Sequence, residues 1–238
     1  HMIYTLSDAM KTGISRYAAD RDIRVIPNWS AFSHLDPIPK ENNNILRRDG
    51  LQGKFIIQYS GNIGVTHNVE TLLEVADTLR DETDIIFQII GRGDRINEIA
   101  RRINENELTN CMLLPFRHDF ELYESLCEAD IAVIILDDKT PDISIPSKIY
   151  NIMSAGLPIM AIASHDSGLA ELVTRHQLGK VFEKNDISGM RKFIHELMSN
   201  EKQRSLYSSN SLEASGIYTS QNAGLYLSSY IEKTIDQV

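Results

Sequence analysis

The residues with the clearest chemical potential gather in the segment SIPSKIYNIMSAGLP, which runs from Ser144 to Pro158. Pro146 interrupts the backbone, and Ser147 follows at a position where a side-chain oxygen typically caps a helix by accepting from a free amide. Gly156 suits the left-handed residue that ends such a helix. Lys148 then falls in the first helical turn, where its charge opposes the helix dipole. We predict that a bound phosphate explains this placement, with a solvated lysine as the plain alternative.

Two further loops carry groups that suit a phosphate. The loop GNIGVTHN supplies Gly61 and Gly64, and the loop GRGDR supplies Gly91 and Arg92. Glycine lets the backbone approach a ligand closely. An ordinary strand-to-helix turn is the alternative interpretation of the first loop. The pattern GxxxxGK[ST] is absent from the sequence, so these loops and the Ser-Lys pair predict a diphosphate site without a Walker motif.

Asn151 follows Lys148 by three residues, so both side chains are expected on one side of the helix. There the Asn151 amide would bind a ribose hydroxyl, although a surface asparagine is an equally acceptable interpretation. The dinucleotide fingerprint is incomplete, because Ile96 stands where GxGxxG needs its third glycine. No acidic residue ends the next predicted strand, at 111–115, to hold a ribose. A nicotinamide cofactor is therefore not expected.

Regular elements must position these groups. Strands are predicted at residues 55–60, 85–90, 111–115, 131–136, 158–163 and 179–183. Helices are predicted at residues 68–80, 94–106, 119–128, 147–156, 167–175, 187–200, 202–214 and 220–235. The strands are continuous apolar runs that alternate with helices, which is typical of an α/β fold with a Rossmann-like parallel sheet covered by helices on both faces. Such a sheet binds ligands at the carboxyl ends of its strands, near its topological switch point.

The residues before this sheet are less regular. A serine-capped helix at 7–20 and a strand at 23–27 precede a polar segment, 28–53, that contains prolines and an asparagine run. We predict that this segment is a linker with one short helix at 44–49. His1 and Met2 resemble an expression-tag scar.

Bulk composition narrows the classes of function. The 238 residues carry a net charge of −9, which argues against sequence-independent nucleic-acid binding. The apolar runs are far shorter than the roughly 20 residues of a transmembrane helix. Cys111 and Cys127 lack metal-binding spacing, and we expect buried, reduced thiols in a cytoplasmic protein.

Six motifs occur in an order that resembles a known family. They are VIPNWS (Val25–Ser30), YSGNIG (Tyr59–Gly64), IIGRGD (Ile89–Asp94), LPF (Leu114–Phe116), EADIAVIIL (Glu128–Leu136) and PSKIYNIMSAGLPIMA (Pro146–Ala161). Together they resemble the C-terminal, donor-nucleotide domain of the retaining glycosyltransferases of family 4. The bacterial branch that builds capsule, O-antigen and exopolysaccharide chains is the most similar. The resemblance implies the C-terminal half of a GT-B fold, in which two Rossmann-like domains face a cleft.

The resemblance also implies a division of the chain. Residues 1–27 would comprise the tag scar and the end of an N-terminal acceptor domain, and residues 28–53 the linker region. Residues 54–219 would form the domain that binds the nucleotide sugar. Residues 220–238 would form a helix that crosses back to the N-terminal domain.

Site roles follow from the resemblance as well. The loop Leu114–Arg117, which includes Phe116, would meet the base through backbone groups. The helix that begins at Ser147 would meet the ribose and the phosphates. The backbone of Asp142–Ile145, which includes Ser144, would lie against the donor sugar.

The sequence departs from the family pattern at four positions. Asn62 and His67 stand where the family usually has arginine and lysine, and Ile143 and Asn151 stand at the two glutamates of its EX7E motif. We therefore expect Lys148 and Arg92 to carry the phosphate charge as the catalytic cations. His67 would titrate near neutral pH if it contacts the leaving phosphate, whereas a structural histidine at a helix start is the alternative.

The function implied is transfer, with retention, of a hexosyl or N-acetylhexosaminyl group from a UDP or GDP sugar. The acceptor would be a glycan or a lipid-linked glycan in cell-surface polysaccharide synthesis. No cofactor, metal ion or nucleic-acid partner is expected. The full enzyme would be cytoplasmic, with peripheral association at the inner face of the cell membrane, and this fragment alone would be inactive. A sugar-nucleotide 2-epimerase and a non-catalytic nucleotide-binding module remain as alternatives.

Overall fold

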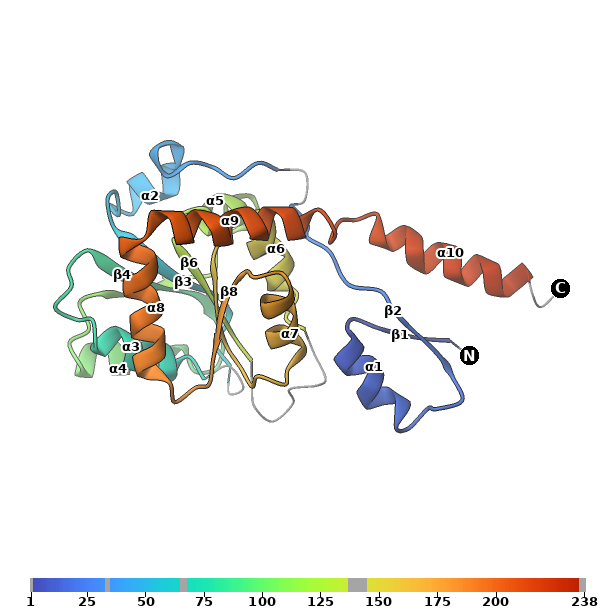
Figure 1. The fold of residues 1–238 in the computed structure, drawn as a ribbon. Helices are drawn as coiled ribbons and strands as arrows, with labels where there is room; N and C mark the ends of the chain where they lie inside the picture. The colour runs from blue at the N-terminus through green and yellow to red at the C-terminus, as the bar shows by residue number, and fades with distance from the viewer. Residues whose placement is uncertain (1, 33–34, 65–67, 137–144, 236–238) are drawn as a thin grey trace.

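A six-stranded parallel sheet forms the centre of the protein (Figure 1). The computed structural model describes residues 2–32, 35–64, 68–136 and 145–235. The strands are β3 (Phe55–Asn62), β4 (Ile85–Arg92), β5 (Cys111–Pro115), β6 (Ile131–Ile135), β7 (Ile159–Ile162) and β8 (Gly179–Phe182). The helices are α3 (Glu70–Asp77), α4 (Ile96–Glu105), α5 (Asp119–Leu126), α6 (Lys148–Ser154), α7 (Gly168–Arg175), α8 (Ile187–Ser199) and α9 (Glu201–Ser215). The predicted Rossmann-like α/β fold is confirmed.

The strand order is β5-β4-β3-β6-β7-β8, so the sheet changes direction at β3. The chain first builds outward from β3 through β4 to β5, and then returns to the other side of β3 with β6. The pairing of β3 with β4 continues to Asn62, whereas its pairing with β6 runs from Ile57 to Tyr59. The carboxyl ends of β3 and β6 therefore separate, as is usual at the switch point of such a sheet.

Both faces of the sheet are buried, which explains why its strands are continuous apolar runs. On one face, α3, α4 and α8 pack against side chains such as Val133 of β6. On the other face, α5, α6 and α7 pack against side chains such as Ile134. Successive residues of one strand thus enter two different hydrophobic clusters.

The residues at the two ends of the chain lie together beside this domain (Figure 1). β1 (Met2–Thr5) pairs in parallel with β2 (Asp22–Val25), and α1 (Asp8–Ser15) connects them. β1 was not predicted, and Met2 belongs to it. α10 (Asn222–Ile235) contacts this unit, because the Tyr226 hydroxyl donates to the carbonyl oxygen of Ile26 at 2.9 Å. The rings of Tyr4 and Tyr226 also pack with centroids 5.0 Å apart.

The polar segment between β2 and β3 is packed against the sheet. It contains the 3₁₀ turn η1 (Lys40–Asn42) and the short helix α2 (Asn44–Arg48), which confirms the helix predicted at 44–49. The Asn43 side chain caps α2 by accepting from the amide of Leu46 at 2.8 Å. Leu46 and Leu51 are buried against Ile56 of β3.

Two predicted helix ends have the expected geometry. The Ser7 side chain accepts from the amide of Met10 at 3.2 Å and so caps α1. Gly156 has a φ of +68°, and the next amide, of Leu157, donates to the carbonyl of Ile152 at 3.3 Å. This pair of features is the Schellman arrangement that ends α6.

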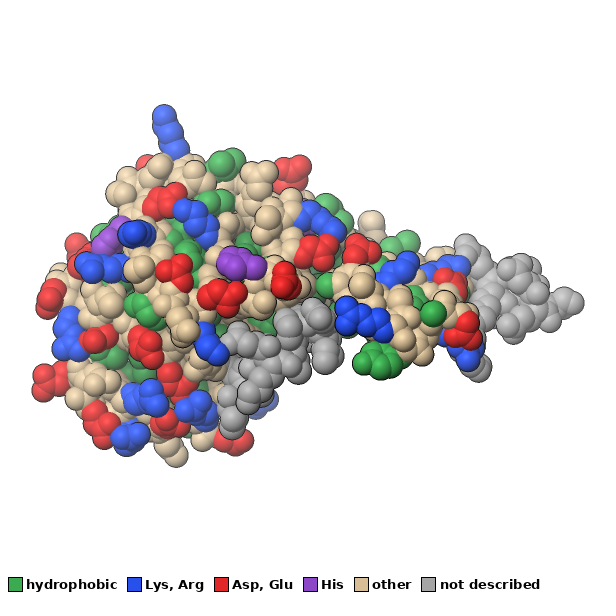
Figure 2. Space-filling view, turned by 60° about the horizontal axis from the view of Figure 1, so that its bottom comes forward, with side chains coloured by type: hydrophobic (Ala, Val, Ile, Leu, Met, Phe, Trp, Pro, Cys, Tyr) green, Lys and Arg blue, Asp and Glu red, His purple; other side chains and the backbone are tan. Residues whose placement is uncertain are grey.

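The visible surface carries mixed charge. On the face drawn in Figure 2, acidic and basic side chains are interspersed, and neither sign forms a continuous field. Among the described residues, no helix has both the length and the apolar character that crossing a membrane requires.

We predict that Gly91→Ala lowers the melting temperature. Gly91 pairs with Gly61 across β4 and β3, and a Cβ atom at position 91 would lie 2.0 Å from the carbonyl oxygen of Gly61. Relief of this overlap requires a backbone shift, with a cost of about 1–3 kcal/mol and a fall of about 2–12 °C in Tm by differential scanning calorimetry. Gly13→Ala is the control, because no atom lies within 4 Å of its added Cβ. Equal melting temperatures for Gly91→Ala and the parent chain would contradict this account of the strand ends.

Candidate functional site

A cavity of about 340 Å³ lies where β3 and β6 separate. Ser60, Gly61 and Asn62 at the end of β3, Phe116 after β5, Leu122 and Leu126 of α5, and Pro146, Ser147, Lys148, Asn151 and Ile152 at α6 line it. Its volume falls in the range of roughly 300–1,000 Å³ that is usual for small-molecule sites. The sheet topology therefore places a ligand-sized cavity at the edge predicted from the sequence.

Lys148 is the cation of this cavity. Its Nζ donates to the carbonyl oxygen of Ser60 at 3.3 Å and lies 4.1 Å from the ring centroid of Tyr59. A Cβ atom at Gly61 would lie 2.9 Å from the same Nζ. Gly61 thus leaves the space that the ammonium group occupies beside the strand end.

Burial lowers the pKa of Lys148 to about 7, because the surrounding protein replaces much of the water around its ammonium group. Within the described residues, no carboxylate forms an ion pair with Lys148 to offset this effect. A phosphate near Nζ would supply the missing counter-charge and raise the pKa again. The site is therefore suited to a ligand that carries negative charge.

Ser147 differs from its predicted role as a helix cap. It has helical backbone angles, φ −58° and ψ −24°, and its side chain makes no capping hydrogen bond. A capping side chain needs the extended backbone that Ser7 has, so the prediction for Ser147 was wrong. Its exposed hydroxyl instead lines the cavity next to Lys148.

Asn151 joins the cavity to the segment before the sheet. Its Oδ1 accepts from the Ser30 hydroxyl at 3.1 Å and from the amide of Ala31 at 3.1 Å. The Ser30 hydroxyl also lies 2.8 Å from that of Ser154. Because its oxygen is engaged in this way, Asn151 can offer a ligand only its amide hydrogens, as far as the described residues determine. The predicted contact with a ribose hydroxyl stays a prediction.

Phe116 and Arg92 form the outer part of the site. Phe116 is 42% exposed and lines the cavity. The Arg92 guanidinium carbon lies 5.3 Å from the centroid of the Phe116 ring. Arg92 pairs with Asn62 in the sheet register, but it does not belong to the cavity lining. The structure therefore separates the two cations predicted for phosphate binding: Lys148 is in the cavity and Arg92 is at its margin.

The glycines of the two loops allow the two backbone segments to approach each other closely. As shown above, Gly91 faces the backbone of Gly61. A Cβ atom at Gly93 would lie 2.4 Å from the carbonyl oxygen of Ile63, and one at Gly64 would lie 2.9 Å from Nδ2 of Asn62. The GxG sequence thus packs one strand-end loop on the other, which gives these glycines a role that requires no dinucleotide.

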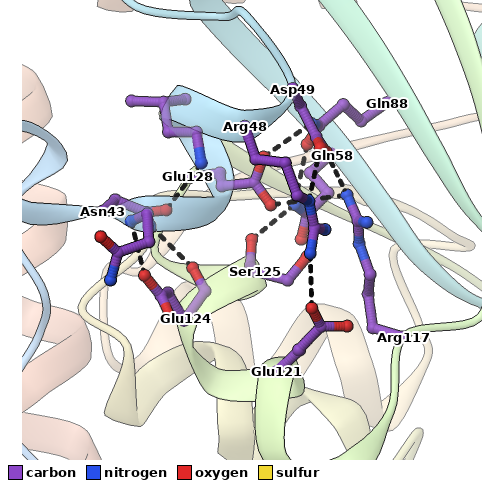
Figure 3. A network of polar contacts seen from close by, with 12 residues as sticks. Asn43, Arg48, Asp49, Gln58, Gln88, Arg117, Glu121, Glu124, Ser125 and Glu128 are labelled. Atoms are coloured by element: carbon purple, nitrogen blue, oxygen red, sulfur yellow. Dashed lines mark hydrogen bonds and ion pairs between the residues drawn. The ribbon is translucent and has the colours of Figure 1, made fainter.

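Arg117 does not line the cavity. Its side chain is 9% exposed and forms an ion pair with Asp49 of the linker, in a network drawn in Figure 3. The backbone contact predicted for its loop stays a prediction. Two other predicted site residues, His67 and Ser144, and also Ile143, lie outside the described residues.

Several lining residues were not predicted. Leu122, Leu126 and Ile152 form an apolar wall, and the Tyr59 ring lies beneath the Lys148 ammonium. Helical spacing marks the first three only as core positions, because periodicity does not distinguish a cavity wall from a packed face. Among the described residues, no group of three or more His, Cys, Asp or Glu side chains could hold a metal ion.

The strand order and the helices on both faces of the sheet define a Rossmann-like domain, and this fold matches that of GT-B glycosyltransferase structures. The chain belongs to the family described as Glycosyl transferases group 1, whose model matches residues 42–213. This match includes the whole sheet and every residue that lines the cavity.

Curated relatives come from bacteria. The chain is 24% identical over 180 residues to "Probable glycosyltransferase WbjE" of Pseudomonas aeruginosa, which covers 74% of this chain and 44% of that protein. It is 30% identical over 149 residues to "Putative colanic acid biosynthesis glycosyl transferase WcaI" of Escherichia coli K12. This match covers 62% of this chain and 36% of that protein. The matched part is less than half the length of either relative.

Solved structures share the fold at low identity. HepE from Anabaena, solved in complex with UDP, superposes with a TM-score of 0.80 at 15% identity, covering 100% of this chain and 64% of HepE. WaaG, a glycosyltransferase involved in lipopolysaccharide biosynthesis, superposes with a TM-score of 0.72 at 13% identity. The match covers 94% of this chain and 60% of WaaG.

We predict that Lys148→Met stabilises the free protein, most strongly at low pH. Between pH 7 and the ordinary lysine pKa of 10.5, the unfolded chain binds a proton at Lys148 that the folded chain does not. The stability of the parent chain therefore rises with pH across this interval, and below it the folded state bears the full cost of burying the charge. Urea unfolding should give Lys148→Met a midpoint above that of the parent chain at pH 6, and the difference should shrink by pH 9.5.

Lys192→Met is the matched control for this measurement, because Lys192 is exposed on α8. It should show no such pH-dependent difference. A Lys148→Met variant that is less stable than the parent chain at pH 6 would refute a desolvated Lys148.

Proposed function

We propose that this chain is the donor-binding part of a retaining glycosyltransferase of family 4, and that its substrate is a nucleoside-diphosphate sugar. The observation that carries the proposal is the cavity at the switch point of the sheet, with the desolvated Lys148 in its wall and no carboxylate paired with it among the described residues. A partly buried ammonium group without a paired carboxylate is stabilised when an anion binds beside it.

In this proposal the diphosphate lies beside Lys148. The Ser147 hydroxyl lines the same region and would donate to a phosphate oxygen. When the sugar leaves, negative charge develops on the diphosphate, and a charged Lys148 would stabilise it without a metal ion. Lys148 is thus the residue that we propose as catalytic.

The base would occupy the end of the cavity near Phe116. Leu122 and Leu126 supply an apolar wall there, and the partly exposed Phe116 ring is free to pack on a flat group. HepE, the structural neighbour above, was solved with UDP, and another neighbour, pneumococcal GtfA, with UDP and GlcNAc. These complexes support UDP as the first nucleotide to test, with GDP as the alternative, and a hexosyl or N-acetylhexosaminyl group as the sugar.

The acceptor would bind to another part of the enzyme. This chain spans 44% and 36% of the two curated relatives, so we propose that a second domain completes the cleft and holds a glycan or a lipid-linked glycan. A full enzyme of this kind would work in the cytoplasm, peripherally at the inner face of the membrane. We expect no sugar transfer by these 238 residues alone.

A non-catalytic nucleotide-binding module is the second candidate. Asn151 favours it, because this residue stands at one glutamate of the EX7E motif and its oxygen is already bound to Ser30 and Ala31. Sugar transfer by the full-length protein would exclude this candidate, whereas nucleotide binding without transfer would support it.

We predict that isothermal titration calorimetry detects saturable binding of one nucleoside diphosphate among UDP, GDP and ADP, equally with and without magnesium. Lys148→Met should weaken it by about 10- to 100-fold, because a charge-assisted hydrogen bond contributes about 1.5–3 kcal/mol. Lys192→Met should bind like the parent chain. Preferential binding of NAD would overturn the assignment, as would nucleotide binding that Lys148→Met leaves intact.

A further inference from the structure

A buried polar network connects the linker before the sheet to the loop that borders the cavity (Figure 3). Its central residue is Arg117, which follows Phe116 directly and precedes α5. The Arg117 guanidinium forms an ion pair with Asp49, just after α2, and an Nη atom lies 3.9 Å from Oε1 of Glu128. Glu128 is completely buried. Burial of a guanidinium and a carboxylate costs desolvation free energy, so we expect this ion pair to have a role in the site.

The strands hold the inner side of this network in place. Gln58 of β3 and Gln88 of β4 are direct partners in the sheet register, and Nε2 of Gln58 donates to Oε1 of Gln88 at 2.9 Å. Gln88 in turn donates to Oε2 of Glu128 at 2.9 Å. Gln58 also donates to the carbonyl oxygen of Ser125 in α5 at 2.8 Å. The inner carboxylate is therefore hydrogen-bonded to β4 through Gln88 and connected through that residue to Gln58 of β3.

The linker holds the outer side. Arg48 donates to Asp49 at 3.1 Å and to Glu121 of α5 at 2.6 Å. Asn43 donates to the carbonyl oxygen of Glu124 at 2.8 Å. Asp49 is thus held between two arginines, and α2 is fixed along α5. Figure 3 shows Arg117 reaching this group from the loop before α5.

The loop itself has few other restraints. Phe116, Arg117 and His118 lie between β5 and α5, and the backbone hydrogen bond found for them among the described residues runs from the amide of Glu121 to the carbonyl of His118. The Phe116 side chain is partly exposed at the cavity, so packing alone does not fix it. Together with the Arg92 guanidinium, whose carbon lies 5.3 Å from the centroid of the Phe116 ring, the buried side chain of Arg117 restrains this loop.

We propose that Arg117 is a positioning residue. Its buried ion pair with Asp49, close to Glu128, fixes the loop that contains Phe116. This loop would in turn fix the wall of the cavity that faces the base. This inference rests on the proposed nucleotide-binding function. It assigns the linker a part in base selectivity, since Asp49 lies outside the sheet domain. Discrimination between bases depends on groups held at fixed positions, whereas attraction for a diphosphate depends mainly on the charge of Lys148.

The test compares the affinities of UDP, GDP and ADP in variants of the chain. Asp49→Asn conserves the shape of the side chain and removes its charge, and is therefore the primary variant. Arg117→Met removes the other partner, and the double variant tests whether the two act through each other. Arg101→Met is the matched control, because Arg101 pairs with Glu105 on α4 with side chains 59% and 56% exposed. Circular dichroism melting verifies that each variant is folded.

We expect Asp49→Asn and Arg117→Met to weaken the preferred nucleotide by about 10-fold and the other two much less, so that selectivity falls. The double variant should resemble Arg117→Met, and Arg101→Met should resemble the parent chain. Equal weakening of all three nucleotides, or unchanged affinities in folded Asp49→Asn, would overturn the inference and leave the proposed function intact. If the parent chain binds none of the three, the proposed function fails and this inference fails with it.

Discussion

The separation of β3 from β6 is the constraint on which the rest of the site depends. The strands pair in parallel and form one buried sheet. The strand order reverses at β3, so that the carboxyl ends of β3 and β6 separate. The cavity, the Lys148 ammonium and the glycine that leaves room for it all lie at this opening. A charged side chain is tolerated there because the backbone carbonyl of Ser60 and the face of Tyr59 partly replace water.

Residues of the linker between β2 and β3 also contact the residues around the cavity. Asn151 is bound by the segment at Ser30 and Ala31, and Arg117 is bound by Asp49, so two separate parts of the linker contact residues at the cavity or next to it. The linker therefore belongs to the architecture of the site as well as to the connection between β2 and the sheet. Its prolines and asparagines predict a linker, and its buried Leu46 and Leu51 pack it against β3.

The sequence predicted the elements well, because each buried strand is a short apolar run bounded by polar turns and several helices, such as α3 and α7, have a clear apolar face. It missed β1, whose first residue, Met2, was assigned to an expression-tag scar. It also assigned Ser147 a cap that its helical backbone does not permit. The direction of the Arg117 side chain was not predictable, since it depends on Asp49, 68 residues away. The glutamines at 58 and 88 were an overlooked signal, because a polar residue inside an apolar strand requires a buried partner.

The central claim is that Lys148 receives the diphosphate, and proton uptake on binding tests it most directly. At pH 8.5 a group with a pKa of about 7 is mostly neutral, and contact with a phosphate would return its proton. Calorimetric titration of the preferred nucleoside diphosphate in two buffers with different ionisation enthalpies measures this uptake. We predict about one proton taken up per nucleotide by the parent chain and none by Lys148→Arg, whose guanidinium is already charged. Binding with no proton uptake by the parent chain, or with equal uptake by both proteins, would contradict the account.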